Sequence, residues 1–136
     1  YTFAIDTLTG LPLPGDWTDL GNGLAGSTGV PALEGSGSLA GGDVARLTLT
    51  GVAGPTTVAV FGGFSQVDLP LSGGVLVPSP DVVRFFPVGA AGVLELAAVW
   101  PTGVPSDTEV TFQVWVADAG GPFGLAASNA VVGVTP

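Results

Sequence analysis

Residues 109–118 read EVTFQVWVAD, and this stretch carries the strongest structural signal in the chain. Valine and phenylalanine occupy positions 110, 112, 114 and 116, whereas Thr111, Gln113 and Trp115 occupy the positions between them. Alternation with a period of two is typical of a β-strand, and β-branched and aromatic residues favour that conformation. We therefore expect a strand with one continuous apolar face.

Comparable runs occur along the rest of the chain, with connectors rich in Gly, Pro, Ser and Asp between them. No ten-residue segment keeps a helical spacing free of Gly or Pro, so very little helix is expected. About eight short strands separated by turns predict an all-β fold, an antiparallel β-sandwich of the immunoglobulin-like or jelly-roll-like kind. Residues 10–42 are expected to be irregular. The predicted strands cover 2–8, 43–50, 56–61, 74–78, 81–86, 93–100, 109–118, 122–128 and 129–135.

The composition fits a single folded domain. The chain has 136 residues, of which 46% are hydrophobic, so it can bury a core. Its 23 glycines and 12 prolines are therefore interpreted as tight turns between short strands rather than as disorder.

The charge balance excludes two kinds of partner. Eleven acidic residues face only two basic ones, Arg46 and Arg84, which gives a net charge of −9. Nucleic acid and anionic membrane surfaces both need a basic protein surface, so neither is an expected partner. No apolar run reaches the ~18 residues of a membrane span.

The chain contains no Cys, Met or His. Disulfides, thiolate zinc sites and the usual nucleophile–histidine pairs are therefore excluded. Because Met is missing, we expect either a processed product or a piece of a longer protein. Removal of a secretory signal peptide would account for Tyr1 and predicts an extracellular or cell-surface location.

Residues 21–136 resemble an uncharacterised Gly/Pro-rich C-terminal domain of large secreted bacterial proteins. Three phrases carry the resemblance: GNGLAGSTGVPALEGSGSLAGGDVARLTLTG (21–51), VFGGFSQVDLPLSGGVLVPSPDVV (60–83) and AGGPFGLAASNAVVGVT (119–135). That family has no assigned activity or catalytic residues. The resemblance implies an extracellular β-sandwich used as an appended module, and residues 1–20 precede the part that it covers.

Three patterns are candidates for chemistry, and none predicts an enzyme. Gly21, Gly23 and Gly26 spell G-x-G-x-x-G, but no helix can follow them, as a dinucleotide site requires. Asp107 and Glu109 could face the same way as paired carboxylates of a hydrolase, although acids at a strand entrance are usually solvated. Oxygens of Asp16, Asp19 or Asp107 are suitable calcium ligands, but no calcium-binding motif is present. We therefore expect no catalytic residue, metal site or cofactor.

The tryptophans and arginines offer candidate contacts. Trp100 shares a face with Leu94 and Leu96 and is expected in the core. Trp115 either faces outward, to contact a sugar or another chain, or is covered by residues 10–42. Trp17, in a Pro/Gly-rich loop, could act as a lid or an anchor. Arg46 and Arg84 either pair with acids across a strand or anchor an interface.

The segment YTFAIDT at residues 1–7 has strand spacing, with Tyr1, Phe3 and Ile5 on one face. The sequence LPLPGDW separates it from the predicted domain, and two prolines favour an extended path there. The chain is therefore divided into residues 1–20, a strand with a Pro-rich tether, and residues 21–136, the sandwich. The first strand either pairs within its own sheet or completes the sheet of a neighbouring copy.

These observations favour a non-enzymatic extracellular subunit that assembles with copies of itself into a filament or surface layer. The residues predicted at the subunit interface are Tyr1, Phe3, Ile5, Trp17 and Trp115. The alternative is a secreted carbohydrate-binding or adhesion module that presents Trp115 to surface glycans.

Overall fold

The structure, a computed structural model, describes residues 17–136. It contains antiparallel strands and turns and no helix within this range, so the predicted all-β class is confirmed. Tyr1, Phe3 and Ile5 lie outside the described residues. The strands are β1 (Trp17–Gly21), β2 (Ala32–Ser36), β3 (Val44–Thr50), β4 (Thr56–Gly63), β5 (Gln66–Leu71), β6 (Gly74–Pro78), β7 (Val82–Val88), β8 (Leu94–Val99), β9 (Glu109–Ala117), β10 (Leu125–Ala127) and β11 (Ala130–Val134).

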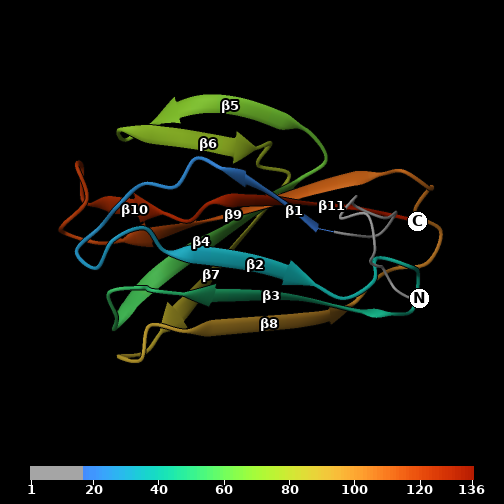
Figure 1. Cartoon of the computed structure of the whole chain (residues 1–136), viewed down its shortest axis with the longest axis horizontal. Coiled ribbons are helices and arrows are strands. Elements are labelled where there is room, and N and C mark those ends of the chain that lie inside the picture. Colours follow the sequence, from blue (N-terminus) through green and yellow to red (C-terminus); the bar gives the residue numbers. More distant parts are fainter. Residues whose placement is uncertain (1–16) are drawn as a thin grey trace, which may run out of the picture.

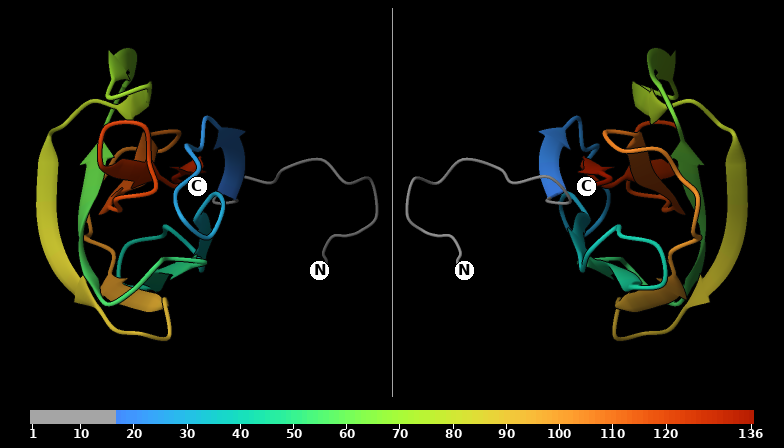
Figure 2. Two further views of the ribbon diagram at one scale, coloured as in Figure 1. Left: turned by 90° about the vertical axis from the view of Figure 1, so that its left-hand side faces the viewer. Right: turned by 90° about the vertical axis from the view of Figure 1, so that its right-hand side faces the viewer.

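These strands form a large sheet, a small sheet and a hairpin (Figure 1). The large sheet has the order β1-β11-β9-β4-β7, with β10 also paired to β9. The small sheet has the order β2-β3-β8, and it packs on one face of the large sheet (Figure 2). The hairpin β5-β6 lies over the opposite face. The result is a β-sandwich with an additional two-stranded layer.

The main core lies between the two sheets and contains the apolar side chains that the alternation predicts. Leu33 and Leu49 of the small sheet share one buried cluster with apolar residues of the large sheet, which include Val58, Val60, Val114, Val116 and Val131. A second, smaller cluster surrounds Trp115 beneath the β5-β6 hairpin. Strand β9 is therefore buried on both faces, which explains why nearly every residue from 110 to 116 is buried.

Eleven strands are present within residues 17–136, where the sequence predicts eight of them. The additional ones, β1, β2 and β5, contain WTDLG, ALEGS and QVDLPL and lack a clear two-residue period. Partner strands specify them instead, since β1 pairs with β11, β2 with β3 and β5 with β6. Residues 10–42 are consequently less irregular than predicted, and the sandwich includes Trp17–Leu20 ahead of the predicted boundary at Gly21.

Candidate functional site

Two strand edges lie free on the same side of the sandwich. Among the described strands, β7 is the last strand of the large sheet and pairs only with β4, while β8 is the last strand of the small sheet and pairs only with β3. The two strands are joined by residues 89–93 and diverge from that connection as a V (Figures 1 and 2). No ladder joins β7 to β8, so the sandwich is open on this side.

On the opposite side of the sandwich, specific contacts bridge the two sheets beside a cleft of about 450 Å³, whose partly polar lining includes Asp19 and Glu34. Trp17 of β1 packs against Gly35 of β2, where an added Cβ would collide with the indole ring, and it also lies close to Gly133 of β11. Its Nε1–H donates to the carbonyl oxygen of Gly37 at 3.0 Å. The Asn129 side chain accepts from the N–H of Leu33 (2.8 Å) and donates to its carbonyl oxygen (2.9 Å), as a strand neighbour would. Together these contacts join the small sheet to the large one.

A cleft of about 370 Å³ lies between β7 and β8, and we call it the edge cleft. Its walls are almost entirely apolar, and it exists because small residues occupy inward positions near its mouth. Ala45 pairs with Ala98 across β3 and β8, and Gly62 pairs with Val82 across β4 and β7. The lining residues are Trp17, Ala45, Arg46, Leu47, Val60, Gly62, Val82, Arg84, Phe86, Leu96, Ala97, Ala98, Trp100 and Phe112.

The edge cleft leaves part of the core incompletely covered. Leu47, Phe86, Leu96 and Phe112 pack against the buried cluster but remain only partly buried themselves. Apolar surface left in contact with water costs about 25 cal/mol per Å² relative to burial. A contiguous apolar hollow of this kind is typical of a binding surface.

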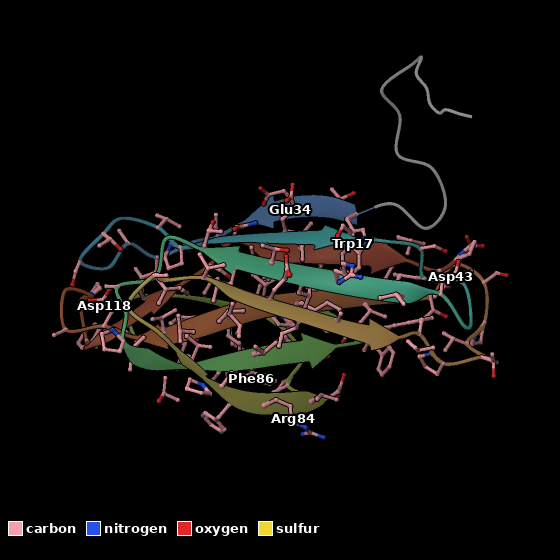
Figure 3. The ribbon with its side chains drawn as sticks, turned by 90° about the horizontal axis from the view of Figure 1, so that it is seen from below. Trp17, Glu34, Asp43, Arg84, Phe86 and Asp118 are labelled. Atoms are coloured by element: carbon pink, nitrogen blue, oxygen red, sulfur yellow. The ribbon has the colours of Figure 1, made fainter. Side chains whose placement is uncertain are left out.

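The charges around the edge cleft are positive. Among residues 17–136, the lining includes Arg46 and Arg84, which are the chain's two basic side chains, and no Asp or Glu. Arg84 extends outward from β7 at the rim, with Phe86 on the same strand (Figure 3), and its Nη1 donates to the carbonyl oxygen of Val83 at 3.0 Å. No ion pair involving either arginine is found within residues 17–136, so the predicted cross-strand pairs are not formed there.

Trp100 lies at the open end of the edge cleft and is only partly buried, rather than fully in the core as predicted. Its Nε1 atom is buried and has no hydrogen-bond partner among the described residues. Leaving a buried donor unpaired costs about 1–3 kcal/mol. The indole N–H of Trp100 thus lacks a partner within the described residues, whereas the indole N–H of Trp17 has one.

No protein family, curated protein or solved structure matches the chain. The resemblance of residues 21–136 to a domain of secreted bacterial proteins therefore stays a prediction. The candidate site consequently depends on the geometry of the chain itself.

Trp115 is not at the surface. Only 4% of its area is exposed, and it packs against Leu76, Ala127 and Leu24 beneath the hairpin and the loop before β2. Its Nε1–H donates to Gln113 Oε1 at 3.2 Å. The outward-facing interpretation is therefore wrong, and the indole cannot reach a sugar or a second chain in this structure. The second alternative, cover by residues 10–42, is correct in part, because Leu24 supplies some of the cover and the hairpin supplies the rest.

Gln113 organises the interior beneath the hairpin. Its side chain is fully buried, and Oε1 accepts from the N–H of Val77 at 3.0 Å. Its Nε2 donates to the carbonyl oxygens of Val75 (3.1 Å), Ser128 (3.1 Å) and Asn22 (3.4 Å). One amide thus joins β6, β9 and two loops. In the sequence, the only sign of this network is a glutamine between apolar residues of the strand.

Two carboxylates hold loops together rather than forming a reactive site. Asp118 accepts from the hydroxyl and the N–H of Ser27 and from the N–H of Gly120, and these bonds lower its pKa. Asp81 accepts from the N–H of Phe64 and the hydroxyl of Ser79, which lower its pKa likewise. Hydrogen bonds donated to an ionised carboxylate stabilise the charged form.

The other acidic residues proposed for chemistry are not brought together. Strand β9 begins at Glu109, and Asp107 precedes it with a positive φ of 61°, so the two do not continue one strand face. Within residues 17–136, no group of three or more acidic, Cys or His residues could hold a metal ion. Asp16 lies outside the described residues. The same range contains no helix suited to crossing a membrane.

Proposed function

We propose that the protein is a non-enzymatic structural subunit that works outside the cell and assembles with copies of itself into a filament or surface layer. An N-terminal strand, residues 1–8, is shared between neighbouring copies. The observation that carries this proposal is the difference between the two sides of the sandwich. Trp17 and Asn129 bridge the sheets on one side, whereas an apolar cleft separates β7 from β8 on the other.

Strand sharing supplies what the open side lacks. An added strand satisfies free backbone N–H and C=O groups along an edge, and its alternate side chains enter the apolar hollow. Tyr1, Phe3 and Ile5 are suited to this, because burying each such side chain contributes about 1.5–3 kcal/mol before the cost of association. A contact passed head to tail does not close on itself, so it generates a filament.

The composition supports a structural rather than a catalytic role. The chain lacks His and Cys, and two of its carboxylates are engaged by loop hydrogen bonds. The carbohydrate-binding alternative loses the residue that suggested it, because Trp115 is buried.

Deletion of residues 1–10 tests the proposal. We expect the full chain to form large particles by light scattering and filaments or sheets by negative-stain microscopy, and the truncated chain to remain monomeric. The physical reason is that truncation removes the shared strand and leaves the described strands β1 to β11 in place.

A matched pair of full-length variants provides the control. Replacing Tyr1, Phe3 and Ile5 with Ser removes the apolar face and should abolish assembly. Replacing Thr2 and Ala4, on the opposite face, with Ser keeps the apolar face and should leave assembly intact. A truncated chain that assembles like the full chain would show that the proposed function is wrong.

A further inference from the structure

We propose that the edge cleft is the acceptor for this shared strand, so that residues 1–8 of one copy pair with the free edge of β8 in a second copy. The side chains of Tyr1, Phe3 and Ile5 then enter the cleft between β7 and β8. This inference rests on the proposed function, and it specifies the partner surface and the strand edge.

Strand β8 is less protected than the edges formed by β7, β5 and β1. Edges are commonly blocked by proline, by charge or by a bulge. Strand β7 contains Arg84 and Pro87, β5 contains Pro70 and an irregular register, and β1 has a register shift between Asp19 and Gly21. The β8 sequence LELAAV has no proline and keeps a regular register with β3, and it has one charged residue, Glu95.

The surface of β8 is also unusually apolar for a free edge. Val99 is 66% exposed, and Val93, just before the strand, is 51% exposed. Ala97 and Ala98 are exposed as well. An exposed edge with these side chains and unpaired backbone groups is a template for another strand.

The shape of the edge cleft suits large apolar side chains. Its inward positions near the mouth are Ala45, Ala98 and Gly62, whereas deeper positions carry Leu96 and Phe112. The incoming strand carries large side chains, Tyr1 and Phe3, on its apolar face. Small residues on the acceptor therefore face large residues on the donor, which permits close packing.

The charges are complementary. The copies carry a net charge of −9 each and repel one another in general, but the edge cleft has two arginines and no carboxylate in its lining. Residues 1–8 bring a single acidic side chain, Asp6. Electrostatic repulsion between two copies is therefore weaker at this cleft, because the described residues that line it include arginines and no carboxylate.

The lengths favour a second copy over the chain's own cleft. Eight extended residues span roughly 26 Å, enough to follow the six residues of β8. Residues 9–16 contain Pro12 and Pro14, and an extended proline-rich tether of eight residues covers about 25 Å. Trp17 lines the edge cleft of its own chain, so residues 1–8 could enter that cleft only if the tether folded back, and Pro12 and Pro14 favour an extended path instead.

A donor-only and an acceptor-only chain test the inference. The donor-only chain is full-length Ala98→Trp, in which the indole occupies the edge cleft from the inward face of β8. The acceptor-only chain is the truncation lacking residues 1–10. We expect each to be monomeric by sedimentation and the equimolar mixture to form a 1:1 dimer that grows no further. Val44→Trp, at the exposed position next to Ala45 on β3 and outside the cleft lining, is the matched control and should assemble like the unmodified chain.

A peptide measurement keeps the test independent of the folding of one variant. We expect a labelled YTFAIDTLTG peptide to bind the truncated chain in fluorescence anisotropy, and Ala98→Trp or Ala45→Trp in that chain to weaken binding at least tenfold. The two positions pair across β3 and β8, so both substitutions fill the same space.

The outcomes separate this inference from the proposed function. If the truncated chain fails to assemble but full-length Ala98→Trp assembles normally, strands are shared at another edge and the edge cleft is not the acceptor. If the full chain is monomeric and the donor-only and acceptor-only chains do not combine, the strand occupies its own cleft or none, and both proposals are overturned. A peptide bound equally by the Ala98→Trp chain also contradicts the edge cleft.

Discussion

Asp118 shows how much a single carboxylate contributes to the loop geometry. It follows β9 directly and holds Ser27, 91 residues earlier in the chain, through two hydrogen bonds. A third bond, from the N–H of Gly120, stabilises the turn before β10. The sequence places an aspartate at a turn, where it is common, but gives no indication that Ser27 is its partner.

The lowered pKa of Asp118 predicts a pH-dependent stability. The folded chain binds this proton more weakly than the unfolded chain, so the contribution is fully present above the unfolded pKa of about 3.9 and is lost as pH falls through the lower folded pKa. We expect the free energy of unfolding by urea to decrease below about pH 4. Asp118→Asn replaces one acceptor oxygen with an NH2 group and removes the charge, so it should destabilise the protein at pH 7. Because the substituted side chain no longer titrates, the variant should lose less stability in acid.

Asp43→Asn serves as the control for this measurement, since Asp43 is exposed and its side chain makes no hydrogen bond within the described range. All of these measurements use the chain lacking residues 1–10, so that assembly does not interfere. In that chain, the free energy of unfolding of Asp43→Asn should vary with pH as it does without the substitution. Equal acid losses in Asp118→Asn and the unmodified chain would contradict the assignment.

At the scale of elements, the β5-β6 hairpin is attached to the sandwich through polar and apolar contacts from β9. Gln113 bonds the N–H of Val77 and the carbonyl oxygen of Val75, while Trp115 packs against Leu76. The two side chains lie on one face of β9, opposite the main core. The sequence of β9 alternates, yet both faces of the strand are covered by other layers. Alternation alone therefore does not distinguish such a strand from one with an exposed face.

Gln113→Met predicts local detachment of this hairpin. Methionine has a similar length but leaves several buried backbone groups without partners, each costing about 1–3 kcal/mol. We expect faster amide hydrogen exchange in residues 66–78 and a free energy of unfolding lower by about 3 kcal/mol. Gln66→Met, at an exposed position on β5, should change neither quantity. Unchanged exchange in Gln113→Met would show that the packing around Trp115 alone holds the hairpin.

At the scale of the whole molecule, charge opposes any association between copies. Each chain carries a net charge of −9, so neighbouring subunits repel at long range. The Debye length falls from about 30 Å at 0.01 M salt to about 10 Å at 0.1 M, which screens this repulsion but leaves apolar burial intact.

We therefore expect added NaCl to lower the concentration at which the full chain assembles. Light scattering across a protein dilution series at 0.01 M and 0.1 M NaCl measures this threshold. The chain lacking residues 1–10 should remain monomeric in both buffers, which separates strand sharing from general precipitation. A threshold that rises with salt would indicate that ion pairs, rather than burial of Tyr1, Phe3 and Ile5, dominate the contact.

The sequence by itself determined the all-β class and eight of the eleven strands, because alternation records which side chains meet a core. Strands such as β1 and β2 were missed because partner strands define them, and backbone pairing leaves little trace in side-chain order. Only the tertiary structure decided that Trp115 is buried and that β7 and β8 diverge around an apolar cleft. Both depend on which layers and edges meet across long sequence separations, and local periodicity carries no information about that.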